Sequence, residues 1–182
     1  MKISNCFIMF LFCITLLSCS TNDDDRGEIT GESGISYSDS KTMWKEVKAQ
    51  NEETYSYTVS FSSWSGFGSR TTITVKDGLV SKRKYLYFEQ VLNEESELEE
   101  VEIESYTETG EEIGSHSEGF DPLLIDELYQ TCLSDYLNIN KADNEIYFNT
   151  DEAGIISNCG FVETGCVDDC FRGFRISEFN WL

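Results

Sequence analysis

Ile73-Thr74-Val75-Lys76-Asp77-Gly78 is the stretch that decides the fold, because it ends a strand in a tight turn. Ile73 and Val75 alternate with polar residues, which is the two-residue period of a strand with one buried face. Both residues of Asp77-Gly78 tolerate positive φ, so the pair predicts a two-residue hairpin. Residues 79–88 are then the returning strand, and the sheet is antiparallel at this point.

The segments on either side add more strands to this hairpin. Tyr55 to Phe61 alternates apolar residues with Ser and Thr, and residues 94–106 keep a weaker alternation before a turn at Thr109-Gly110. Three further strands are expected, one from residue 146 and two at 155–162 and 171–181. The sheet should therefore contain about five to seven strands.

Two segments repeat apolar residues every three to four positions and predict helices. Asp39 or Ser40 can cap the first helix, which runs to about Gln50. Asp121-Pro122 places a capping carboxylate before a proline suited to a first turn, and the second helix carries a broad apolar stripe as far as Leu137. Because this order lacks regular βαβ alternation, we predict an α+β fold: a single domain with an antiparallel β-sheet and two helices packed on one face.

Residues 1–18 resemble a bacterial lipoprotein signal peptide. Lys2 precedes the apolar run 7–17, and Leu16-Leu17-Ser18-Cys19 places a cysteine directly after the cut. The resemblance implies that Cys19 is lipidated and that the protein's membrane contact is this lipid anchor. An ordinary signal peptide and a transmembrane helix are the alternatives. A transmembrane helix needs about 20 apolar residues, and the polar residues after Cys19 end the run earlier.

Residues 19–38 predict a flexible acidic tether behind the lipidated cysteine. They consist mainly of Ser, Thr, Asp, Glu and Gly, so they cannot form a core. Asp23-Asp24-Asp25 resembles the tags that carry some Gram-negative lipoproteins to the outer face of the outer membrane, and a solvated linker is the alternative. We expect a cell-envelope, outer-membrane lipoprotein, on either the periplasmic or the surface-exposed face, whose single domain spans residues 39–182.

The charge balance narrows the range of partners. The chain has 13 basic and 34 acidic residues and a net charge of -21. Nucleic acid is therefore not expected as a partner, because phosphate contacts need clustered Lys and Arg. A negative field of this kind favours cations or basic partners instead.

The cysteines predict a disulfide-bonded domain. Once the signal is removed and Cys19 is lipidated, four remain: Cys132, Cys159, Cys166 and Cys170. An exported protein meets an oxidising compartment, so two disulfides are expected, with three possible pairings. In one pairing Cys166 and Cys170 close a short loop, and Cys132 of the second helix joins Cys159. Zinc is the competing interpretation, but the paired two-residue spacing of structural zinc sites is missing.

Cys166-Val167-Asp168-Asp169-Cys170 is the densest chemical feature of the predicted domain. Asp168 and Asp169 are candidate calcium ligands, because calcium accepts several oxygens in flexible arrangements, although no EF-hand spacing is present. Their negative charge disfavours a thiolate, which argues against thiol exchange. No cofactor is expected.

No catalytic set can be assembled from the sequence. His116 is the single histidine, and its serine neighbours would suit a hydrolase base, yet no Gly-x-Ser-x-Gly pattern occurs and a surface-loop histidine is the alternative. The stretch 93–100 has enough carboxylates for a glycosidase pair, as has any solvated acidic face. Several aromatic residues could form either a ligand platform or part of the core: Trp64, Phe67, Trp181 and the outward-facing half of the strand from Tyr55 to Phe61.

Several short segments also carry a family resemblance. They are Trp44, Tyr55-Ser56-Tyr57-Thr58, Ile73-Thr74-Val75-Lys76-Asp77-Gly78, Thr109-Gly110-Glu111, Gly154-Ile155-Ile156, Asp168-Asp169 and Gly173-Phe174-Arg175-Ile176. With the order of elements, residues 40–182 resemble a bacterial secreted family catalogued as domain of unknown function 6174. Many members carry paired cysteines in the strand that here reads Val59-Ser60-Phe61-Ser62-Ser63, where this chain has none. The resemblance implies fold and location and transfers no catalytic residue.

These observations lead to three hypotheses of function. The first is a lipid-anchored envelope domain that binds a protein or an envelope component without catalysis. The second is an envelope hydrolase that cleaves glycans or peptides with acidic side chains. The third is a purely structural lipoprotein. A pocket with two convergent carboxylates would favour the enzyme.

Overall fold

The computed structural model describes residues 28–182, so the predicted signal peptide, Cys19 and the first part of the tether lie outside the described residues. Its elements are α1 (Tyr37–Gln50), β1 (Tyr55–Ser62), β2 (Phe67–Lys76), β3 (Leu79–Leu92), β4 (Leu98–Thr109), α2 (Ile125–Thr131), β5 (Asn144–Thr150), β6 (Ile156–Glu163) and β7 (Arg172–Trp181). A 3-10 turn (Gly110–Glu112) follows β4, and a π-helical segment (Cys132–Leu137) continues α2.

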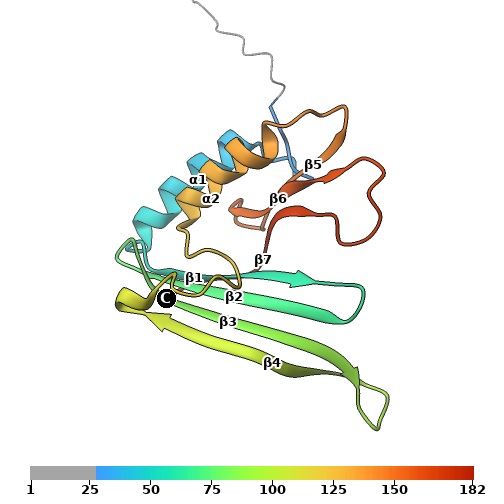
Figure 1. Ribbon diagram of the computed structural model, residues 1–182. Coiled ribbons are helices and arrows are strands. Elements are labelled where there is room, and N and C mark those ends of the chain that lie inside the picture. The colour runs from blue at the N-terminus through green and yellow to red at the C-terminus, as the bar shows by residue number, and fades with distance from the viewer. Residues whose placement is uncertain (1–27) are drawn as a thin grey trace, which may run out of the picture.

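The strands form one antiparallel sheet of seven in the order β4-β3-β2-β1-β7-β6-β5 (Figure 1). The predicted hairpin is confirmed, since Asp77 and Gly78 have φ of 50° and 74° between β2 and β3. The α+β class is also confirmed, with the strand number at the upper end of the predicted range. Among residues 28–182, no helix is long and apolar enough to cross a membrane.

The core lies between the helices and the inward side chains of the sheet. Trp44 of α1 is fully buried, stacks on Trp181 with ring centroids 5.7 Å apart, and meets Tyr55 edge-on at 5.1 Å. Asp126 of α2 joins the two helices, because its carboxylate accepts from Trp44 Nε1 at 3.1 Å and from Lys48 Nζ at 2.8 Å. Each buried side chain of this size contributes about 1.5–3 kcal/mol of transfer free energy.

Both predicted helix caps are wrong. Ser36 caps α1, because its hydroxyl accepts from the Asp39 N–H at 3.1 Å, while Ser40 lies inside the helix and in the core. Asp121 does not cap α2, since the helix begins only at Ile125. Its N-cap residue is Leu124, whose N–H donates to the Glu127 carboxylate at 2.7 Å. The Tyr57 hydroxyl, which projects from the sheet, holds the segment before α2 by donating to the Leu123 carbonyl. In both cases a tertiary contact outweighs the local capping preference.

The predicted tether boundary also needs correction, because residues 28–38 belong to the folded part. Ile29 packs against the core, and Thr30 forms an isolated bridge with Ser36. The Glu32 N–H donates to Asn149 Oδ1 of β5 at 3.0 Å. A few apolar residues in an otherwise polar stretch, Ile29 and Ile35 among them, are enough to dock this segment beside the outermost strand.

The acidic strand begins later than predicted, at Leu98. Asn93 builds the preceding turn, since its side-chain oxygen accepts the N–H groups of Glu95 at 3.0 Å and Glu97 at 2.9 Å. Ser96 takes a positive φ of 64° in the same turn. β4 is then an edge strand, exposed along most of its length.

Candidate functional site

The sheet splits on one side between β1 and β7. Their pairing begins at Tyr55↔Trp181 and ends at Val59↔Ile176, after a register shift at Thr58/Val59. β1 nevertheless continues to Ser62, and the first residues of β7 pair only with β6. The two strands therefore diverge, as Figure 1 shows where β1 and β7 separate.

A cleft of about 620 Å³ lies between the diverging strands. It is lined by Val59, Ser60, Phe61, Ser62, Ser69, Thr71, Gly119, Phe120, Val162, Cys166, Asp168, Asp169, Cys170, Phe171, Gly173, Phe174 and Arg175. Its inner end is buried at Phe174, whereas Phe61 is half exposed. Its volume lies in the range of small-ligand sites, about 300–1,000 Å³.

Two facing glycines let β7 pack tightly on β6 as it leaves β1. Gly173 has a φ of 149°, and a Cβ there would lie 2.1 Å from the Cys159 carbonyl oxygen. A Cβ on Gly160 would lie 2.4 Å from the Arg172 carbonyl oxygen. Only glycine fits such a close approach of two backbones, so these residues fix the wall of the cleft.

The cysteine loop forms the mouth of the cleft. Cys166 and Cys170 are bonded, with their Cα atoms 6.1 Å apart, as one of the predicted pairings has it. Between them Asp168 and Asp169 take positive φ values of 70° and 35°, a conformation that costs free energy outside glycine. Asp169 Oδ2 accepts from the Ser63 hydroxyl at 2.6 Å, which joins the loop to the end of β1.

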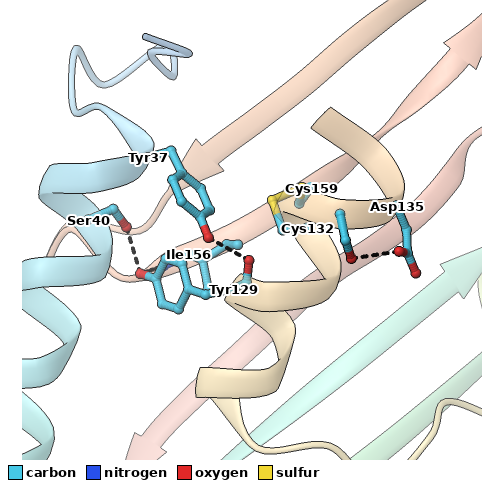
Figure 2. The surroundings of a disulfide bond; sticks show 8 residues. Tyr37, Ser40, Tyr129, Cys132, Asp135, Ile156 and Cys159 are labelled. Atoms are coloured by element: carbon cyan, nitrogen blue, oxygen red, sulfur yellow. Dashed lines mark hydrogen bonds between the residues drawn. A yellow bond between two sulfur atoms is a disulfide. The ribbon is translucent and has the colours of Figure 1, made fainter. Parts of the chain in front are cut away.

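The second disulfide, Cys132–Cys159, belongs to the core and completes the same predicted pairing (Figure 2). Both cysteines are fully buried, and the bond ties the end of α2 to β6. Beside it the Tyr129 hydroxyl shares a 2.6 Å hydrogen bond with Ser40 and accepts from the Ile156 N–H at 3.0 Å. Burial raises the pKa of Tyr129 to about 12, so the hydroxyl stays protonated and this cluster is structural.

Among residues 28–182, no group of three or more His, Cys, Asp or Glu side chains could hold a metal ion. Asp168 and Asp169, the sequence's calcium candidates, lie next to each other at the mouth of the cleft. The partner of Asp169 is the Ser63 hydroxyl.

Sequence reasoning missed a buried ion pair under the loop that follows β4. Arg83 and Glu108 are about 1% exposed, and Arg83 Nη1 lies 3.2 Å from the Glu108 carboxylate. Arg83 also donates to the carbonyls of His116 at 3.1 Å and Phe120 at 2.9 Å. The guanidinium therefore satisfies backbone oxygens of a loop that has no sheet partner.

Glu108 holds the same loop from the other side. It accepts the N–H groups of Gly114 at 2.7 Å and His116 at 2.8 Å, and the His116 ring at 2.9 Å. Burial alone would raise the pKa of Glu108, but these hydrogen bonds and Arg83 outweigh it and hold the pKa at about 2. The carboxylate is ionised at neutral pH and unsuited to act as a general acid.

The arrangement around His116 differs from a hydrolytic triad. His116 lies in a surface loop, half exposed and stacked on Tyr106 with ring centroids 4.0 Å apart. The Ser115 hydroxyl and Glu108 both approach Nδ1, at 3.3 Å and 2.9 Å. In a triad the nucleophile and the orienting acid bind opposite ring nitrogens, so this cluster supports the loop and not acyl transfer.

The remaining sequence candidates do not converge on the cleft. Trp181 packs in the core, whereas Trp64 is 77% exposed at the turn between β1 and β2. Phe67 stacks on Tyr87. The carboxylates of residues 94–104 lie along the exposed β3–β4 hairpin, outside the cleft lining.

A second hollow of about 660 Å³ lies beside the N-terminal segment and α2. Ile29, Tyr37 and Leu133 are among its lining residues. Glu28, the first residue that the structure describes, lies at the border of this hollow. The residues that precede Glu28 in the chain are not described. The cleft at the sheet split is the better defined candidate site.

In residues 28–182, fold and site together define an α+β structure whose seven-stranded sheet opens into a cleft beside a disulfide-closed loop. Comparison with protein-family models, with curated proteins and with solved structures gave no match.

Proposed function

We propose that this chain is a lipid-anchored lipoprotein of the bacterial cell envelope whose domain binds a ligand in the cleft between β1 and β7. The observation that carries the proposal is the cleft itself, with a buried aromatic end and a mouth of two carboxylates. Its residues combine apolar surface with a few polar groups, the usual composition of a binding site. Membership of the secreted family that the sequence resembles belongs to the same proposal.

The structure of the site supports binding through a rigid frame. The Thr71 hydroxyl is buried and accepts from the Phe120 N–H at 2.9 Å, which fixes one wall of the cleft. The Cys166–Cys170 bond and the Asp169–Ser63 hydrogen bond restrain the mouth. A preorganised site loses less conformational entropy when a ligand binds.

The anchor is tested by replacing its cysteine. Cys19→Ala should abolish incorporation of metabolically supplied palmitate, because the replaced thiol is the acceptor of the lipid. Labelling is measured by autoradiography of the purified protein, and Cys13→Ala, which changes only the signal, is the matched control. Equal labelling of the parent and Cys19→Ala would reject the lipoprotein part of the proposal.

Binding in the cleft is tested by filling it. Ser69 lines the cleft, and Ser69→Trp should remove whatever envelope component co-purifies with the tethered protein from solubilised membranes. Ser105→Trp places the same side chain on the exposed β4 and is the control. Co-purification is compared by mass spectrometry, and thermal melts show that both variants are folded. Identical co-purification with the folded Ser69→Trp variant would place binding elsewhere.

A further inference from the structure

The backbone at the end of β1 offers unpaired hydrogen-bonding groups to the cleft. The Ser63 N–H donates to the Phe67 carbonyl of β2 at 2.8 Å. Hydrogen-bonded pairs alternate along an antiparallel ladder, and the register continues through Phe61↔Ser69 and Ser62↔Gly68. The N–H and C=O of Ser62 therefore point away from β2, toward the side that β7 has left.

The opposite wall of the cleft is also a strand edge. β7 pairs with β6 from Arg172 to Arg175, and its pairing with β1 starts only at Ile176. Two edges thus face each other over the part of β1 that follows Ser60. Ser60 still contacts β7, because its hydroxyl lies 2.6 Å from the Ser177 hydroxyl. The free edge is therefore short, and the backbone groups that it presents to the cleft are those of Ser62.

The side chains of the cleft leave little flat aromatic surface for a sugar ring. Phe120 and Phe174 meet each other edge-on at 6.0 Å, and the Arg175 guanidinium covers the Phe171 ring at 4.1 Å. Of the phenylalanines that line the cleft, only Phe61 is half exposed. Exposed strand edges, in contrast, are recognised by extended peptides through main-chain hydrogen bonds.

The charges of the cleft favour a basic occupant. Asp168 and Asp169 are exposed at its mouth, and Arg175 is the single cationic side chain in its lining. The whole chain carries a net charge of -21, which favours cationic partners over anionic ones in general.

We propose that the cleft binds an extended peptide segment with basic side chains, which pairs with the β1 edge at Ser62 in the place that β7 leaves free. This inference rests on the proposed function and names the occupant of the same site. The alternate side chains of the segment enter the cleft toward Phe61 and Phe174, and its basic side chains reach Asp168 and Asp169.

The test uses three capped synthetic peptides of about six residues each. Val alternates with Lys in the first, with Ser in the second and with Glu in the third. Binding to the folded domain is measured by NMR chemical-shift titration. The Lys peptide should bind best and the Glu peptide worst, with shifts concentrated at residues 60–62. Ser62→Pro removes the N–H that faces the cleft and leaves the bonds to β2 in place, so it should weaken Lys-peptide binding by about tenfold.

Modified peptides provide a second measurement that does not depend on the folding of a variant. N-methylation of the alternate amides that face β1 should weaken binding by about tenfold, whereas N-methylation of the others should have a smaller effect. Failure of all three peptides to bind, or equal binding by parent and Ser62→Pro, would overturn the inference. If the peptides fail while co-purification still depends on Ser69, the cleft binds another class of ligand and the proposed function stands.

Discussion

Replacing Glu108 by Gln should lower the free energy of unfolding by about 3–5 kcal/mol, because it leaves a fully buried guanidinium without its counter-charge. Arg83 cannot move to water without giving up its bonds to the loop carbonyls. The Gln side chain can replace part of the hydrogen bonding but not the charge. Urea unfolding at neutral pH, followed by tryptophan fluorescence, measures the difference.

The same comparison has a defined dependence on pH. Glu108 has a pKa of about 2 in the folded protein and an ordinary value of 4.5 when unfolded, so its ionisation stabilises the fold above about pH 4.5. This contribution is lost as pH falls through 2. The difference in the free energy of unfolding between the parent and Glu108→Gln should therefore be constant above about pH 5 and should shrink toward pH 2.

Glu100 is the matched control for this prediction. It pairs with Arg70 on the surface, where both side chains are more than one third exposed. Glu100→Gln should change stability by about 0–1 kcal/mol, as is usual for exposed ion pairs. If Glu108→Gln were no more destabilising than Glu100→Gln, the buried pair would not hold the loop as described.

The second large effect is expected from the core disulfide. Replacing Cys132 and Cys159 together by Ala should destabilise the domain by about 3–4 kcal/mol, because the bond closes a loop with a sequence separation of 27 and restricts the unfolded chain. Both sulfur atoms are buried, so small apolar replacements avoid a new unsatisfied polar group. Thermal and urea unfolding of the oxidised proteins provide the measurement.

The exposed disulfide supplies the comparison. Cys166 and Cys170 are only four residues apart, so the same loop-closure argument gives a smaller loss, about 2 kcal/mol or less. The double variant Cys166→Ser, Cys170→Ser should therefore keep most of the stability and change chiefly the mouth of the cleft. A larger loss from this pair than from the core pair would contradict the assignment of the two bonds.

The sequence predicted those parts of the fold that depend on near neighbours. Asp77-Gly78 takes positive φ whatever surrounds it, and the loop between Cys166 and Cys170 is short enough to close by itself. Strand alternation placed β1 and β2 correctly for the same reason. Helix caps were harder, because Ser40 is drawn into the core by Tyr129 and by the Gly154 carbonyl, to which it donates at 2.7 Å.

The candidate site depends on contacts between distant residues. The cleft exists because β1 continues beyond the end of its pairing with β7. This divergence follows from a register shift and from Gly173, which lies more than a hundred residues along the chain from β1. Arg83 stands between Lys82 and Lys84 in the sequence, and three adjacent basic residues do not by themselves show that one of them is buried. In the sequence, the available signal was the alternation of Arg83 with Tyr85. In the structure, the register Ile73↔Arg83 places Arg83 on the inward face of the sheet.

The two outer strands of the sheet also decide how copies of the protein meet one another. β5 is covered by the docked segment 28–36, whereas β4 presents a row of glutamates beside exposed apolar residues. Charge of one sign along an edge repels the same edge of a second molecule, and so blocks the open-ended strand pairing that leads to aggregates. Solubility at this edge is electrostatic, and we expect it to weaken in high salt, which screens the repulsion between the glutamates.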